Sequence, residues 1–271
     1  MSSHISKDKL TECIEKTAND YGLTIGEYKE YSEKRLSENI DDYKTVYPKS
    51  PEITLSDGKT YITNLKLMLA QNLYVGNKII GLTDKLSQTL KITIPPIGWY
   101  VSEKYDGIRA IWDGEKFISR GQKVFTYVPE FFIKTMPPGL ALDGEIWISR
   151  NNFKEVSRLS TLKIGSSKSQ KEIDNIWKGT TNDNCVKYMV YDLPNSLQPF
   201  ETRMKYLEQI VKDRTELWKS KNKKLKCPLQ FTTQTKIKSM EELIKTYNKL
   251  TVEGAEGVML RAPNSPYETK R

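Results

Sequence analysis

The residues with the clearest chemical potential lie in the segment Lys104–Arg109, which reads Lys-Tyr-Asp-Gly-Ile-Arg. A lysine amine is protonated at neutral pH, so it becomes a nucleophile only where burial or cationic neighbours favour loss of that proton. Lys104 ends an expected strand, and Gly107 would permit a tight backbone before the next strand. Arg109, Arg120 and a bound metal would supply the positive surroundings. The segment suggests covalent catalysis through Lys104; the alternative is an ordinary hairpin with surface charges.

Two further segments place carboxylates beside apolar strands. Asp143-Gly144-Glu145 lies within the apolar run Leu140–Trp147, and Glu256 opens the run Glu256–Arg261. Carboxylates in apolar surroundings are costly to bury unless a cation or hydrogen-bond donors accompany them. These acids could therefore hold a metal ion. The alternatives are a turn with exposed acids for the first segment and an edge strand with charged ends for the second.

The residue inventory restricts which metal this could be. The chain has one histidine, His4, and three widely spaced cysteines without Cys-x-x-Cys spacing, namely Cys13, Cys185 and Cys227. A disulfide framework or a zinc site is therefore not expected. Any metal should be a hard cation with oxygen ligands, such as Mg²⁺ or Mn²⁺.

The segments that must position these residues alternate between strands and helices. Runs of aromatic and β-branched residues predict strands at 99–104, 108–112, 116–119, 140–149, 188–193, 229–233 and 257–261, with a hairpin at Asp113-Gly114. Helical spacing predicts helices at 6–20, 25–40, 62–73, 152–162, 168–178, 200–219 and 239–250. Strands interleaved with helices in this way predict an α+β fold with antiparallel sheets.

The charge is unevenly distributed along the chain. Residues 1–96 carry 13 basic and 13 acidic side chains, whereas residues 97–271 carry 30 basic and 21 acidic ones. A polyanion such as a nucleic acid would therefore meet the second region, although basic surfaces also serve solubility alone. No apolar stretch is long enough to cross a bilayer, and the N-terminus lacks a signal core, which predicts an intracellular protein in the nucleus or cytoplasm.

The order of the three charged segments resembles the covalent nucleotidyltransferase superfamily, which contains ATP-dependent DNA ligases, RNA ligases and mRNA capping enzymes. Smaller features are similar to the DNA-ligase branch: Leu67–Leu73, Ser119-Arg120-Gly121, Tyr191-Asp192 with Arg203 downstream, and Ser265–Arg271. The resemblance implies an ATP-grasp-like nucleotidyltransferase domain with antiparallel sheets over residues 61–271. A small, mainly helical region of unknown role would occupy residues 1–60.

The resemblance also implies site roles. Lys104 would accept AMP from ATP and pass it to the 5′-phosphate of a nick in duplex DNA, with Asp106 assisting. The implied ATP-binding residues are Glu103, Lys104, Arg109, Arg120, Glu145, Tyr191 and Glu256, with Tyr191 stacked on the adenine. The implied Mg²⁺ or Mn²⁺ ligands are Asp106, Glu145 and Glu256, and the implied nucleic-acid contacts are Arg109, Arg120 and Arg271. We expect a monomer without membrane association, and residues 1–60 could bind a protein partner.

Two departures from the family pattern leave alternatives open. Ser102 stands where many members carry the side chain that reads adenine, so selectivity for ATP rests on the branch alone. The chain ends at Arg271, before the expected Lys-x-Lys strand and the OB-fold domain, so we expect a fragment with weak self-adenylylation and weak nick sealing. An RNA ligase of the same superfamily, or a degenerate module that only binds nucleic acid, would show similar motifs.

Overall fold

The computed structural model describes residues 52–54, 60–62, 67–68, 74–75, 78–79, 97–159, 169–179, 181, 184–194, 196, 198–222 and 225–267. The helices predicted at 6–20 and 25–40 lie outside these ranges. Before residue 97, the backbone forms two short antiparallel pairs, β1 (Glu52–Thr54) with β2 (Thr60–Ile62) and β3 (Tyr74–Val75) with β4 (Lys78–Ile79). No helix within the described ranges is long and apolar enough to cross a membrane.

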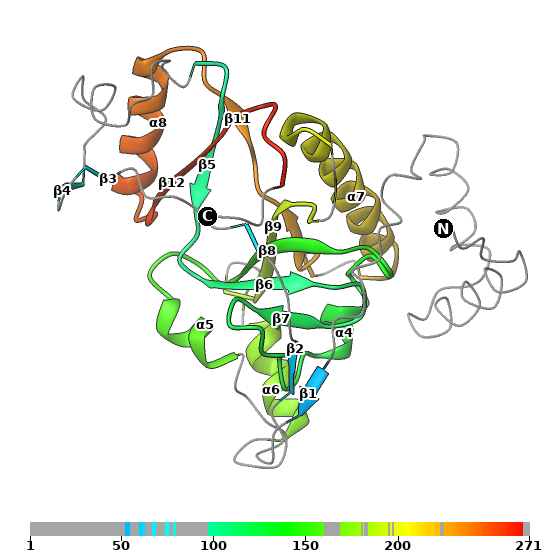
Figure 1. Ribbon diagram of the computed structural model, residues 1–271. Helices are drawn as coiled ribbons and strands as arrows, with labels where there is room; N and C mark the ends of the chain where they lie inside the picture. The colour runs from blue at the N-terminus through cyan, green and yellow to red at the C-terminus, as the bar shows by residue number, and fades with distance from the viewer. Residues whose placement is uncertain are drawn as a thin grey trace, which may run out of the picture.

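A five-stranded sheet lies at the centre of the fold (Figure 1). Its spatial order is β10 (Leu229–Phe231), β9 (Lys187–Asp192), β8 (Leu142–Trp147), β6 (Ile108–Trp112) and β7 (Phe117–Ser119). The predicted hairpin joins β6 to β7: the Asp113 carboxylate accepts hydrogen bonds from the backbone N–H groups of Glu115 and Lys116. Gly114 follows with φ +104°, a conformation that favours glycine.

The pairing of β9 with β10 is parallel, whereas the other neighbours in this sheet are antiparallel. The antiparallel sheets that the sequence predicts are confirmed, with this one parallel pair as an exception among the described strands. The long helix α7 (Phe200–Lys221) connects β9 to β10 and packs on both strands. A helical crossover of this kind returns the chain in the same direction, which explains the parallel pair.

A second, three-stranded sheet combines strands from the start and from the end of residues 97–261. β5 (Tyr100–Lys104) lies between β11 (Thr235–Lys236) and β12 (Gly257–Arg261), antiparallel to both. Helix α8 (Met240–Val252) covers one face of this sheet, where Val101, Ile237 and Leu243 form a small buried cluster. Because side chains alternate along a strand, Ser102 and Lys104 occupy the opposite face of β5 from Val101.

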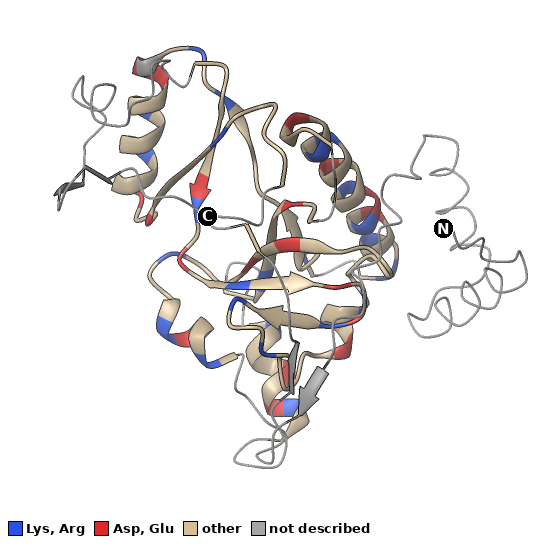
Figure 2. Cartoon of the chain, viewed as in Figure 1, with Lys and Arg blue, Asp and Glu red and all other residues tan. Residues whose placement is uncertain are grey.

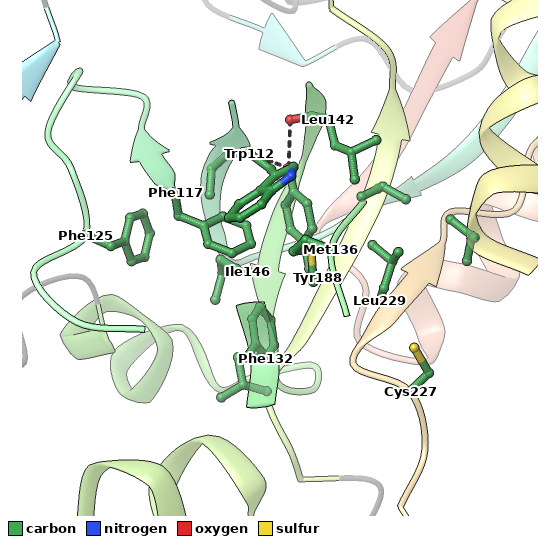
Figure 3. Close-up of a cluster of buried hydrophobic side chains, with 14 of the residues drawn as sticks. Trp112, Phe117, Phe125, Phe132, Met136, Leu142, Ile146, Tyr188, Cys227 and Leu229 are labelled. Carbon is green, nitrogen blue, oxygen red and sulfur yellow. Dashed lines mark hydrogen bonds between the residues drawn. The ribbon is translucent and has the colours of Figure 1, made fainter. Parts of the chain in front are cut away.

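The main hydrophobic core lies on one face of the five-stranded sheet, under the short helices α4 (Glu130–Ile133) and α6 (Gln170–Lys178) and beside α7. Aromatic rings dominate it (Figure 3). Phe117 meets Tyr188 edge to face with ring centroids 5.0 Å apart, and Phe132 meets Trp177 in the same manner at 4.7 Å. Since this face is packed by apolar side chains, polar residues of β6 and β8 must occupy the other face.

Gly144 shows how closely this core approaches β8. A Cβ atom at Gly144 would lie 2.7 Å from both the Met189 carbonyl oxygen and Cε2 of Tyr188. The glycine between the two acids Asp143 and Glu145 therefore makes room for the Tyr188 ring on the core face. The acids themselves point to the opposite face.

Most predicted elements between residues 97 and 261 agree with the structure, whereas α4, β11 and the short strands β1 to β4 are not among those predicted. Helix α5 (Phe153–Leu159) starts as expected within 152–162, and 160–162 lie outside the described residues. The helix predicted at 62–73 is wrong at the described positions: Ile62 ends β2, and Leu67 and Met68 are irregular. The Met68 carbonyl accepts a hydrogen bond from Arg109, 2.5 Å away, which competes with a helical bond.

We predict that Gly144→Ala destabilises the fold, because the added methyl group collides with Tyr188 and the β9 backbone. Overpacking of this kind costs about 1–3 kcal/mol of unfolding free energy. Urea denaturation followed by tryptophan fluorescence measures the loss. Gly121→Ala is the matched control, because a Cβ there meets only Ser119 Oγ, at 3.9 Å. Equal stability of the two variants would contradict the packing at Gly144.

Candidate active site

Lys104 and Glu256 meet at the end of the three-stranded sheet. Gly257 of β12 pairs with Lys104 of β5, which brings the preceding residue, Glu256, beside the lysine. The Lys104 amine forms an ion pair with Glu256 Oε1. The two side chains are 41% and 43% exposed, so the pair borders solvent and an incoming ligand can reach it.

Glu145 approaches the same place from the five-stranded sheet. It stands opposite Arg109 across the β6–β8 pair and is mostly buried. Burial raises its pKa to about 8, and the negative charge of Asp143 adds to the rise. The positive charges of Arg109 and Lys104 oppose the rise, and Glu256 reinforces it. Glu145 therefore shares one electrostatic environment with the Lys104–Glu256 pair, although the three residues come from distant segments.

Gly107 allows this approach. A Cβ at Gly107 would collide with the Ile146 carbonyl oxygen and lie 2.8 Å from Cγ of Glu145. The turn between β5 and β6 can thus pass directly over β8. The glycine predicted to permit a tight backbone is required here by the closeness of a neighbouring strand rather than by its own φ.

Arg109 is engaged with the buried carboxylate of Asp143. Its Nε and Nη2 donate to the two carboxylate oxygens of Asp143 at 3.0 and 2.6 Å. The hydroxyl of Tyr267 donates to Asp143 Oδ2 at 2.7 Å, so the segment after β12 joins this network. Burial lowers the pKa of Arg109, but the charge and hydrogen bonds of Asp143 outweigh it together with Tyr191 and Tyr267, and the pKa is raised.

Tyr191 occupies an irregularity between β8 and β9. Asp143 pairs with Asp192 while the next residue, Gly144, pairs with Val190, so Tyr191 is the extra residue of a β-bulge. A bulge changes the direction of the side chains around it and is frequent beside active sites. Burial and the nearby charge of Asp143 raise the pKa of Tyr191 well above its usual value. Tyr191 therefore faces the same charged region as Asp143 and Glu145.

Asp192 connects the two sheets. Its carboxylate accepts hydrogen bonds from Arg203 Nε of α7 at 2.6 Å and from Arg261 Nη1 of β12 at 2.7 Å. Asp192 and Arg203 are fully buried. Arg203 also donates to the carbonyl of Ser265 at 2.9 Å. The strand of one sheet, a helix and the last strand of the other sheet are thus held by one carboxylate.

The remaining sequence candidates lie around this centre or away from it. Asp106 is half-buried in the turn between β5 and β6. Arg120 is exposed, and it directly follows Ser119, the partner of Ala110 beside Arg109. Glu103 is not brought into the cluster, because both of its carboxylate oxygens are bonded to Arg150. Arg271 lies outside the described residues.

The residues fit a magnesium ion only together with a ligand. Among the described residues, no group of three or more His, Cys, Asp or Glu side chains is arranged to hold a metal. Magnesium, however, is usually held by one or two carboxylates plus substrate phosphates. Glu145 of β8 and Glu256, which directly precedes β12, supply two carboxylates. Figure 2 shows the acidic residues of β8 next to the basic residue of β6.

Three of the residues that organise the site were not identified as such from the sequence. From the sequence, Asp143 is expected to help hold a metal rather than to pair with Arg109, Asp192 is only part of a motif, and Arg261 is only a charge at the end of a strand. A sequence signal existed, because each is a charge at the end of, or inside, a largely apolar run. Their role becomes visible only when the structure shows which charges on different strands pair with one another.

Comparison with known proteins points to one family. Residues 81–271 match a family described as the ATP dependent DNA ligase domain. A DNA ligase of Haemophilus influenzae is 31% identical over 179 residues, which cover 65% of this chain and 56% of that protein. A DNA ligase of Archaeoglobus fulgidus is 26% identical over 179 residues, which cover 62% of this chain and 29% of that protein.

Among solved structures, one of a Lig E DNA ligase, whose description concerns DNA binding with a minimal scaffold, has a TM-score of 0.50 and 25% identity to this chain. The alignment covers 66% of this chain and 60% of that one. The chain therefore spans little more than half the length of this structure and of the Haemophilus influenzae relative, and a smaller share of the Archaeoglobus fulgidus one.

We predict that the stability of the chain depends on Glu145 between about pH 4.5 and about pH 8. In this window the folded protein keeps a proton on Glu145 that the unfolded chain releases. Stability therefore falls as pH rises, by about 1.4 kcal/mol per pH unit from this group, and the loss is complete above its folded pKa. Glu145→Gln removes this contribution and becomes more stable relative to the wild type as pH rises.

Urea unfolding of the two proteins at about pH 5 and about pH 8 measures the difference, since the other titrating groups cancel. Glu155→Gln serves as the control, because Glu155 lies exposed on α5. A difference between wild type and Glu145→Gln that stays constant with pH would show that the Glu145 carboxyl is not held in its neutral form.

Proposed function

The chain belongs to the ATP-dependent DNA ligase domain family, and from this premise we propose that it transfers AMP from ATP to Lys104 and then to the 5′-phosphate of a nick. The observation that carries the proposal is the meeting of Lys104, Glu145 and Glu256, which come from two different sheets. A lysine amine beside two carboxylates, at a place that solvent reaches, suits attack on a phosphate whose charge a metal neutralises.

The first step forms one bond and breaks one. The Lys104 nitrogen bonds to the α-phosphorus of ATP, the bond to the bridging oxygen breaks, and pyrophosphate leaves. The amine must lose its proton to the bordering water before it attacks, because only the neutral nitrogen has a free lone pair. The product is a phosphoamide that holds AMP, which a 5′-phosphate of DNA can then attack. A neighbouring 3′-hydroxyl finally displaces AMP and seals the strand.

Glu145 and Glu256 would hold a magnesium ion, assisted by Asp106. The ion would supply positive charge to the phosphate oxygens as negative charge builds up on them. Because Glu145 has a pKa of about 8 when its site holds no cation, the ion would favour the ionised carboxylate. Glu256 would exchange its contact with the Lys104 amine for contact with the ion, which frees the nitrogen lone pair once the proton has left.

The neighbours of this centre suit binding of the rest of ATP and of DNA. Tyr191 lies at the bulge between β8 and β9, and its ring would stack on adenine. Both carboxylate oxygens of Asp143 accept hydrogen bonds from Arg109. We therefore assign Arg109 mainly the role of holding the Asp143 carboxylate in place, with contact to phosphate secondary. Arg120 is exposed at the end of β7 and can reach a DNA phosphate.

We assign nicked duplex DNA as the substrate, because residues 97–271 carry the whole net positive charge of the chain and the matched relatives are DNA ligases. Phosphate contacts by Lys and Arg supply most of the affinity for duplexes. We further infer that the chain acts as a monomer inside the cell.

Lys104→Ala should abolish the transfer of label from α-labelled ATP to protein, since the variant lacks the nitrogen to which AMP would be bound. The protein is incubated with labelled ATP and Mg²⁺ and then denatured, and the bound label is counted. The product accumulates one AMP per chain, so even a slow reaction is measurable. Lys154→Ala is the control, because Lys154 is exposed on α5. Equal labelling of the Lys104 variant, or no labelling of the wild type after prolonged incubation, would contradict the proposal.

We predict that labelled protein passes its AMP to nicked duplex DNA faster than to the same nick in duplex RNA. The purified, labelled protein is mixed with each substrate at equal concentration, and the adenylylated strand is followed on a denaturing gel. A preference for the RNA nick would favour an RNA ligase. Retention of AMP on the protein with both substrates would argue for a function other than joining strands.

A further inference from the structure

Arg150 connects three segments that surround the proposed site. It follows β8, and its Nε and Nη2 donate to the two carboxylate oxygens of Glu103, each at 2.9 Å. Its Nη1 donates to the Glu253 carboxylate at 3.0 Å and lies 3.2 Å from the Glu253 carbonyl oxygen. One guanidinium therefore ties the end of β8, the end of β5 and the end of α8 together.

Both anchoring carboxylates lie next to the groups assigned to chemistry. Glu103 directly precedes Lys104 and pairs with Val258 of β12. Glu253 begins the short turn that leads to Glu256. Arg150 itself lies shortly after β8, the strand that carries Glu145. Lys104 and Glu256 thus lie one and three residues from carboxylates that Arg150 holds, and Glu145 lies five residues before Arg150 itself.

The backbone around this contact is tightly fitted. Asn151 has φ +63° and Gly254 has φ +90°, and a Cβ at Gly254 would lie 3.3 Å from the Asn151 side chain. Arg150 and Glu103 are only 27% and 15% exposed, so their pair is partly screened from water. A bidentate guanidinium–carboxylate pair in such surroundings fixes orientation as well as distance.

We propose that Arg150 is a positioning residue for adenylylation, which sets the spacing between Lys104 and the carboxylates of Glu145 and Glu256 through its bonds to Glu103 and Glu253. Arg150 acts through these residues and does not touch ATP. The inference rests on the proposed function, since it concerns the rate of AMP transfer to Lys104. A misplacement of about 1 Å at a reacting centre can cost on the order of 100-fold in rate.

The test compares Arg150→Ala, Arg150→Lys and Glu253→Gln with the wild type. Lysyl-AMP formation is followed in single turnover over a range of ATP concentrations, and thermal unfolding is recorded for each protein. We expect Arg150→Ala to lower the maximal rate about 10–100-fold, with the half-saturating ATP concentration changed less than about threefold. Arg150→Lys should remain slow, because an ammonium cannot make the bidentate pair.

Two further readouts separate positioning from folding. Methylguanidinium in solution should restore part of the rate of Arg150→Ala and none of the rate of Lys104→Ala. Arg150→Ala combined with Glu253→Gln should be no slower than Arg150→Ala alone, because both changes remove the same connection. Arg158→Ala, a change of an exposed arginine on α5, should match the wild type.

The outcomes distinguish the two proposals. If the wild type and Arg158→Ala label while Arg150→Ala labels at the wild-type rate, the positioning role is wrong and the proposed function stands. The positioning role is also wrong if the rate loss tracks the unfolded fraction, with no rescue by methylguanidinium. If the wild type does not label at all, the proposed function fails, and the role of Arg150 fails with it.

Discussion

The fold depends on how it satisfies carboxylates that are buried between two sheets. Asp143, Glu145 and Asp192 all lie on strands of the five-stranded sheet, where an unpaired charge is costly. Arginines compensate two of them, Arg109 for Asp143 and the pair Arg203 and Arg261 for Asp192. Within the described part of the chain, Glu145 has no such ion-pair partner, and burial together with the charge of Asp143 raises its pKa. The proposed site thus includes Glu145, the one of these three carboxylates whose charge is not balanced by an arginine ion pair within the described residues.

This arrangement explains why the residues of the site come from distant segments. The Asp192 carboxylate holds β12 against β9, and β12 in turn fixes Glu256 beside Lys104. Arg150 makes a second connection, between the end of β8 and the ends of β5 and α8. The sheets can therefore present an amine and two carboxylates at a place that solvent reaches, with a cation and phosphates supplying the charge that the protein lacks.

The sequence predicted much of the fold and part of the site. Strands 108–112 and 257–261 have the bounds that residue type and alternation predicted, since both are local properties. Lys104, Glu145 and Glu256, which the structure brings together, belong to motifs in a distinctive order, and their catalytic roles stay a prediction. The bulge at Tyr191, the commitment of Glu103 to Arg150 and the failure of the helix at 62–73 could not be read in this way. Each depends on a partner more than 30 residues away, which local periodicity does not encode.

A crystal structure of the chain grown with ATP and Mg²⁺ is the sharpest test of the proposed chemistry, because it locates both the nucleotide and the ion. We expect the α-phosphorus on the Lys104 nitrogen, or in line for its attack, with the ion between Glu145 and Glu256 and the adenine against Tyr191. A nucleotide bound elsewhere, with the ion pair of Lys104 and Glu256 undisturbed, would contradict the proposed mechanism.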